Sequence, residues 1–96
     1  MMVLITYDIQ TSKPKGAKRL RRVAKICKNY GQRVQFSVFE CSLEPDKWVK
    51  VRQKLIDEID LEKDSLRFYF LGANWKRRIE HIGAKETYDV EGSLII

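Results

Sequence analysis

The opening of the chain, Met2 to Asp8, constrains the fold more than any other stretch. Five consecutive residues are apolar or β-branched, and a tyrosine and an aspartate follow them. A short continuous apolar run of this kind is typical of a buried strand inside a sheet. We therefore expect a central strand here, with Asp8 where the strand leaves the sheet. In that position Asp8 is either a turn or helix cap or a site residue.

The length of the chain limits its organisation. Its 96 residues suffice for one small domain with a modest core, which dimerisation would enlarge. No apolar run is long enough to cross a bilayer, and no signal-peptide pattern is visible, so we expect a cytoplasmic protein without a membrane partner. Cys27 and Cys41 lack metal-ligand spacing, so reduced core thiols are expected.

The hydrophobic pattern predicts an α+β fold with two helices on one face of an antiparallel sheet. Gly31 is expected to end the first helix in a left-handed cap, and Trp48 to lie in the core. The stretch 32–43 alternates like a strand, and it is either one long strand or a hairpin that breaks near Ser37. The expected elements are helices over residues 17–30 and 45–60 and strands over residues 2–8, 32–43, 66–71 and 79–83.

The positive charge of the chain is concentrated in one block. Between Ile9 and Phe39 there is no acidic residue, and this block holds nine of the 19 basic residues. A solvated helix face usually mixes both signs, so a polyanion such as nucleic acid explains the block better. The nine residues are Lys13, Lys15, Lys18, Arg19, Arg21, Arg22, Lys25, Lys28 and Arg33.

Two further features lie near the end of the chain. Lys76, Arg77 and Arg78 follow Trp75, and this group either grips a nucleic-acid strand by charge and stacking or caps an exposed loop. His81 is the only histidine, and we expect it to contact a neighbour or a partner chain rather than to act in catalysis.

Several of these pieces, in this order, resemble the small CRISPR-associated endonuclease family that partners the CRISPR integrase in spacer acquisition. The resemblance extends from about residue 2 to residue 83, and it depends on the ordered set rather than on one motif. The similar segments are Leu4-Ile5-Thr6-Tyr7-Asp8-Ile9, the basic helix segment 18–25, Gly31-Gln32-Arg33-Val34-Gln35, Ser37-Val38-Phe39-Glu40-Cys41, and Asp64-Ser65-Leu66-Arg67-Phe68-Tyr69 with Gly72.

The resemblance implies a ferredoxin-like βαββαβ fold, with residues 32–43 as a hairpin and a core over about residues 2–72. It also implies a homodimer in which residues 73–96, including an extra C-terminal strand and the apolar tail Leu94 to Ile96, pack on the partner. The implied partners are the CRISPR integrase, duplex DNA and single-stranded RNA.

The implied activity is Mg²⁺-dependent phosphodiester cleavage at two copies of Asp8 that face each other across the dimer axis. Tyr7, Arg19, Arg33 and Phe39 match positions that the family associates with this site, and Ser37 lies beside it. Mg²⁺ prefers six oxygen ligands, so two Asp8 carboxylates with a substrate phosphate are about the minimum set.

Three functions remain open at this point. The first is a metal-dependent nuclease that acts on RNA or DNA at Asp8. The second is a clamp without catalytic activity that holds duplex DNA for the integrase, with Asp8 as a structural cap. The third is a toxin-like ribonuclease, which the family also resembles.

Overall fold

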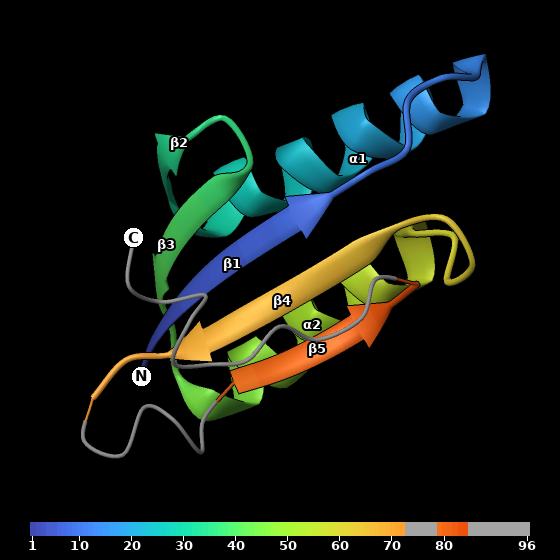
Figure 1. The fold of residues 1–96 in the computed structure, drawn as a ribbon. Helices are drawn as coiled ribbons and strands as arrows, with labels where there is room; N and C mark the ends of the chain where they lie inside the picture. Colours follow the sequence, from blue (N-terminus) through green and yellow to red (C-terminus); the bar gives the residue numbers. More distant parts are fainter. Residues whose placement is uncertain (73–78, 85–96) are drawn as a thin grey trace.

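The fold follows the order predicted from the sequence. The computed structural model describes residues 1–72 and 79–84 (Figure 1). Predictions for Trp75, Lys76, Arg77 and Arg78 and for the apolar tail lie outside these residues. Of the segment 73–96 that the resemblance places on a partner, only residues 79–84 are described, and residues 79–83 form a strand that pairs within the same chain. The elements are β1 (Met2–Asp8), α1 (Pro14–Tyr30), β2 (Gln32–Gln35), β3 (Val38–Ser42), α2 (Pro45–Glu58), β4 (Ser65–Phe70) and β5 (Ile79–Gly83).

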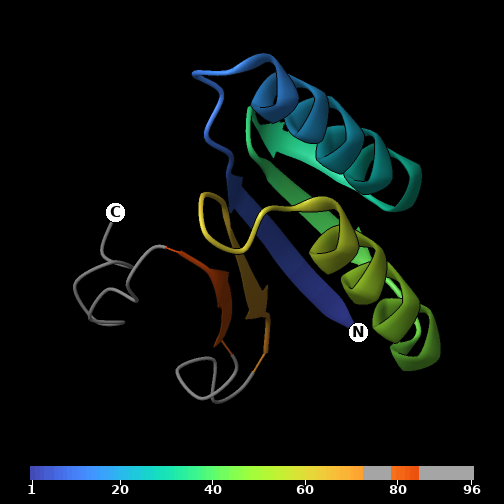
Figure 2. The ribbon, with the colours of Figure 1, turned by 90° about the vertical axis from the view of Figure 1, so that its right-hand side faces the viewer.

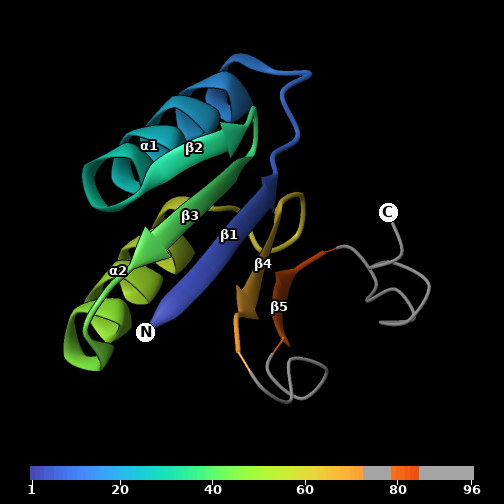
Figure 3. The ribbon, with the colours of Figure 1, turned by 90° about the vertical axis from the view of Figure 1, so that its left-hand side faces the viewer.

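The five strands form one antiparallel sheet in the order β2-β3-β1-β4-β5. As the apolar opening run predicts, β1 is central and pairs with β3 on one side and β4 on the other. Both helices lie on one face of the sheet (Figures 2 and 3). This arrangement confirms the α+β class and the ferredoxin-like fold, with β5 added at the β4 edge.

The core lies between the sheet and the two helices. Val3, Ile5 and Tyr7 alternate along β1 and are buried on the helix side. From α2, Trp48 packs edge-on against Phe68, with ring centroids 4.9 Å apart, which confirms its place in the core. Burying one large apolar side chain contributes about 1.5–3 kcal/mol, so this single layer of side chains carries most of the hydrophobic stabilisation.

The first helix begins three residues earlier than the sequence pattern predicts. It starts at Pro14 rather than Ala17, because proline has no backbone N–H and suits the first helical position. The apolar stripe of the helix then buries Val23 and Cys27 against the sheet. The opposite side of the helix is left to solvent, and most of the basic residues lie there.

Gly31 ends α1, but the prediction of a left-handed cap is wrong. Its φ of −153° is extended, and its N–H donates to the Cys27 carbonyl oxygen at 2.8 Å. The glycine is needed for a different reason. A Cβ at this position would lie 2.3 Å from the Cys41 Sγ and 2.6 Å from the Glu40 carbonyl oxygen. The missing side chain therefore lets the end of α1 approach β3 closely.

The stretch that the sequence left open is a hairpin. β2 and β3 pair antiparallel, and the register shifts between Arg33 and Gln35. The turn carries Phe36, whose side chain is 91% exposed, the largest exposed fraction among the described apolar residues. The second helix ends at Glu58, two residues before its predicted end, and β5 lies where a short strand was expected.

The two cysteines behave as core residues. Cys27 and Cys41 are free and buried, as predicted. Burial raises the pKa of the Cys27 thiol to about 12, so it stays protonated at neutral pH. No described helix is long and apolar enough to cross a membrane.

Candidate nucleic-acid interface and nuclease site

Asp8 lies at the last position of β1, where the sequence places it. It is exposed, and it pairs in register with Ser65 of β4. Because successive strand residues point to opposite faces, Asp8 projects from the face of the sheet that the helices leave uncovered. Its neighbour Tyr7 projects from the helix side. These two predicted site residues therefore serve different faces of the sheet.

Tyr7 joins the end of β1 to the turn of the hairpin. Its hydroxyl donates to the Phe36 carbonyl oxygen at 3.2 Å, and its backbone N–H donates to the Ser37 carbonyl oxygen at 3.1 Å. Its ring stacks on Phe39, with centroids 6.2 Å apart and planes 21° apart. Burial raises the pKa of Tyr7, and Arg33 opposes this only in part, so the hydroxyl remains a hydrogen-bond donor.

Arg33 lies at the surface above this group. Its guanidinium carbon is 4.9 Å from the centroid of the Phe39 ring, which supports it by a cation–π contact. Phe39 itself is fully buried and Ser37 is half-buried. The structure thus brings Tyr7, Arg33, Ser37 and Phe39 together, with Arg33 as the exposed charge.

Arg19 does not join this group. Its Nε donates to Asp64 Oδ2 at 2.6 Å, and its second nitrogen donates to Asp64 Oδ1 at 3.2 Å. Asp64 is fully buried, and its carboxylate also accepts hydrogen bonds from the backbone N–H groups of Gln10 and Asp60 at 3.0 and 2.9 Å. We call this arrangement the Asp64 network. Its guanidinium is that of Arg19, the residue to which the resemblance gives a place in the catalytic site.

The Asp64 network holds the two chain segments beside Asp8. Gln10 is in the loop that follows β1, and Asp64 directly precedes Ser65, the partner of Asp8 in the sheet. Burial alone would raise the pKa of Asp64, but hydrogen bonds from Arg19 and from the Asp60 and Gln10 amides lower it below its usual range. Asp64 is therefore a buried anion at neutral pH.

Sequence reasoning placed Asp64 in a family-like segment but gave it no role. A carboxylate directly before an apolar strand, in a chain with a long acid-free basic block, is the signal that could have indicated an internal ion pair. A second ion pair was also missed. Arg52 of α2 contacts Glu80 of β5 through two hydrogen bonds, of 2.8 and 2.6 Å, and ties the edge strand to the helix layer.

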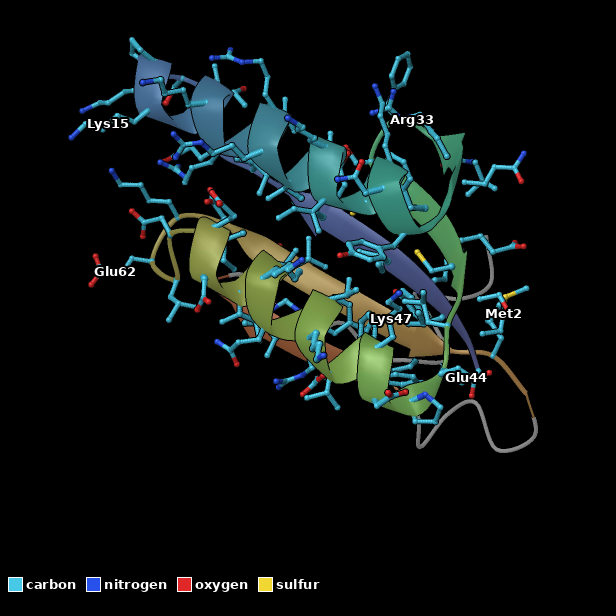
Figure 4. All side chains as sticks on the ribbon, turned by 180° about the vertical axis from the view of Figure 1, so that it is seen from behind. Met2, Lys15, Arg33, Glu44, Lys47 and Glu62 are labelled. Atoms are coloured by element: carbon cyan, nitrogen blue, oxygen red, sulfur yellow. The ribbon has the colours of Figure 1, made fainter. Side chains whose placement is uncertain are left out.

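Exposed cations of the basic block lie along the length of α1 and beside both of its ends. Within the described residues, only Arg19 and Arg22 of its nine cations form ion pairs, with Asp64 and Glu58 respectively. Lys15 lies at one end of the helix and Arg33 beside the other (Figure 4). We call the seven other cations the basic surface: Lys13, Lys15, Lys18, Arg21, Lys25, Lys28 and Arg33.

One chain offers few groups for a metal. In residues 1–72 and 79–84, no group of three His, Cys, Asp or Glu side chains is gathered for a cation. His81 lies on β5 opposite Arg67, and its two ring nitrogens are buried without a hydrogen-bond partner among the residues that the structure describes. Among the described residues, the single Asp8 carboxylate does not by itself meet the ligand demand of Mg²⁺.

Comparison with known proteins identifies the family. The family model described as "CRISPR associated protein Cas2" matches residues 1–79. The chain belongs to the Cas2 family. The matched range includes all four strands of the ferredoxin-like core, both helices and the basic surface, and it ends at the first residue of β5.

Named relatives and a solved structure agree with this assignment. The chain is 64% identical over 96 residues to the "CRISPR-associated endoribonuclease Cas2" of Chlorobaculum tepidum, covering 100% of each. It is 58% identical over 95 residues to the "CRISPR-associated endonuclease Cas2" of Halalkalibacterium halodurans, covering 99% of each. The crystal structure of Streptococcus pyogenes Cas2 at pH 6.5 is 59% identical with a TM-score of 0.71, covering 83% of this chain and 96% of that one.

Proposed function

We propose that this chain is a dimeric, Mg²⁺-dependent endonuclease that binds nucleic acid and works with the CRISPR integrase when new spacers are inserted. The observation that carries the proposal is the basic surface, whose seven cations have no carboxylate partner among the described residues. Cations left without internal partners can neutralise phosphates. Names of the relatives, endoribonuclease and endonuclease, agree with a phosphodiester substrate.

The second part of the proposal is the dimer. No described helix covers the face of the sheet from which Asp8 projects (Figure 2). A second copy packed there would bring a second Asp8 carboxylate to the site, and a substrate phosphate would add further oxygen ligands. Bound Mg²⁺ would activate water and neutralise charge at phosphorus. From the chain itself, the exposed guanidinium of Arg33, which lies over Phe39 beside the turn that Tyr7 fixes, would hold a neighbouring phosphate.

The deciding experiment compares the wild-type protein with Asp8→Ala. Each protein is incubated with single-stranded RNA and with duplex DNA, with Mg²⁺ or with a chelator. We expect the wild type to cut at least one substrate, and we expect both Asp8→Ala and the chelator to abolish cutting. Asp57→Ala is the matched control, because Asp57 is an exposed carboxylate on α2. Cutting that survives in Asp8→Ala would remove Asp8 from the reaction.

A second candidate function is the clamp without catalysis. The observation that favours it is that one chain supplies a single carboxylate at the strand end and no cluster of metal ligands within the described residues. In that case Asp8→Ala and the wild type bind duplex DNA equally and neither cuts. Both functions require the basic surface, so both predict steeply salt-dependent binding, with log K falling by about 0.9 per phosphate contact for each log unit of salt.

The dimer has its own test. Residues 94–96 lie outside the described structure, and the proposal places this apolar tail on the partner. Deleting Leu94 to Ile96 should therefore weaken dimerisation, which sedimentation equilibrium measures directly. A dimer constant equal to that of the full chain would leave the tail without this role.

A further inference from the structure

The hairpin between α1 and the sheet carries a feature that the proposed function does not use. Phe36 lies at the turn with 91% of its side chain exposed, and it contributes nothing to the core. A single exposed apolar side chain is common on protein surfaces, but Phe36 also borders a groove that four cations line. The exposed ring is available to stack on the apolar or aromatic surface of a ligand bound in that groove.

Two hydrogen bonds from Tyr7 hold the turn that carries Phe36. The Tyr7 hydroxyl donates to the Phe36 carbonyl oxygen at 3.2 Å, and the Tyr7 N–H donates to the next carbonyl oxygen, that of Ser37, at 3.1 Å. Tyr7 itself is buried and stacked on Phe39. The backbone under Phe36 is thus tied to the central strand at two points, so little conformational freedom of the turn is lost when a ligand binds.

A groove runs beside this aromatic side chain. It lies between α1 and the hairpin turn and has a volume of about 510 Å³. We call it the hairpin groove. Apolar parts of Tyr7, Leu20 and Ala24 line it, and no acidic residue does. Its charged lining residues are Arg21, Lys25, Lys28 and Arg33.

We propose that the hairpin groove binds a single-stranded or unpaired segment of nucleic acid, with a base stacked on Phe36 and the adjoining phosphates held by the four cations. An aromatic face beside a line of cations is the combination that single-strand binding sites use, because every base has a π-face and every nucleotide has a phosphate. The charge selects a polyanion over an apolar partner, and the exposed ring selects unpaired bases over a closed duplex.

This inference rests on the proposed function, since it assumes that the basic surface binds nucleic acid. It goes further by assigning Phe36 as a base-stacking residue and by making unpaired nucleotides the preferred ligand of this groove. A duplex whose bases are stacked internally would contact only the cations. The groove then distinguishes single strands from duplexes by one side chain.

The test measures binding of a fluorescein-labelled oligouridylate, of a blunt duplex DNA, and of an abasic oligonucleotide with the same backbone. We expect Phe36→Leu, which keeps an apolar side chain but removes the π-face, to lower oligouridylate affinity by about five- to 150-fold. We expect Phe36→Tyr to retain the affinity. Binding of the duplex and of the abasic strand should stay unchanged in both variants.

Val49→Ala is the matched control, because Val49 is another exposed apolar side chain, 64% exposed, on α2. Equal oligouridylate affinity of Phe36→Leu and wild type would overturn the stacking role and leave the proposed function intact. An equal loss for all three ligands, or a changed dimer constant, would overturn it as well, in favour of a contact between copies. Failure of the wild type to bind any of the three ligands would overturn the proposed function itself.

Discussion

The two ends of α1 carry similar charge in the sequence but use it differently in the structure. In the first half of α1, Arg19 forms an ion pair with the buried Asp64. The carboxylate balances the charge of the guanidinium, which is therefore not available to a ligand. Near its end, Lys25 and Lys28 lie beside the hairpin groove with no ion-pair partner among the described residues. A count of basic residues treats these cations alike. Only the position of the carboxylates separates the cation that stabilises the fold from the cations that can bind phosphate.

The largest effect is expected at the beginning of the helix. Asp64→Ala leaves the Arg19 guanidinium and the Gln10 and Asp60 amides without their shared acceptor. Removing one partner of a buried ion pair costs about 3–5 kcal/mol, so the melting temperature should fall by more than 10 °C. Thermal unfolding followed by circular dichroism measures this. Asp57→Ala, which removes an exposed carboxylate, should change the melting temperature little, and equal losses in the two variants would contradict the role of the network.

The same network predicts how stability depends on pH. Because the pKa of Asp64 is lowered in the folded state, its contribution is fully present above the usual pKa of an unfolded aspartate, near 4. It is lost as the pH falls through the lower, folded value. Glu80 adds to this loss, since the hydrogen bond from Arg52 lowers its pKa too. In urea titrations, Asp64→Asn should show a shallower loss of stability with acid than the wild type. Identical slopes would show that Asp64 does not titrate differently in the folded state.

The other end of α1 is held by packing rather than by charge. Gly31→Ala would place a Cβ 2.6 Å from the Glu40 carbonyl oxygen, a backbone atom that cannot move aside cheaply. We expect the strain to destabilise the fold by about 1–3 kcal/mol, less than the loss of Asp64. Urea unfolding gives the value. Gly72→Ala is an instructive control. A Cβ at position 72 would have no atom within 4 Å, but the backbone there has a φ of +140°. Any loss of stability in this variant therefore comes from backbone strain and not from a clash.

The sequence predicts the central elements of the fold because they depend on local pattern. The apolar run before Asp8 identifies β1, and the helical period identifies both helices, apart from the first turn that Pro14 adds. Gly31 was predicted at the right position for the wrong reason, because its constraint comes from Glu40 and Cys41, whose closeness depends on the tertiary structure.

The candidate site was predictable only in part for the same reason. Tyr7, Arg33, Ser37 and Phe39 do lie together, but Asp8, on which the resemblance centres the site, projects from the opposite face of the sheet. The pairing of Arg19 with Asp64 joins residues 45 positions apart, and no local pattern records it. The exposure of Phe36 was not predicted either, because the sequence left open whether residues 32–43 are one strand or a hairpin that breaks near Ser37.

The contrast between the two ends can be sharpened with binding data. Lys25→Gln combined with Lys28→Gln should lower the slope of log K against log salt by about 1.8, or 0.9 for each phosphate contact. When salt is raised from 50 to 200 mM, the affinity of the double variant should therefore fall by a factor about ten times smaller than the factor for the wild type. Lys47→Gln combined with Lys50→Gln on α2 removes the same charge and should leave the slope unchanged. Equal slopes in the two double variants would mean that net charge, and not the basic surface, governs binding.

The smallest effect is expected at Arg22, which is intermediate between the two ends. Its guanidinium lies 3.9 Å from Glu58, and both side chains are partly or largely exposed, so the pair contributes at most about 1 kcal/mol to stability. Glu58→Gln should therefore leave the unfolding free energy almost unchanged while releasing Arg22 for phosphate. We expect nucleic-acid affinity at low salt to rise modestly and the salt slope to steepen by up to about 0.9. A slope that stays at the wild-type value would place Arg22 outside the surface that phosphates reach.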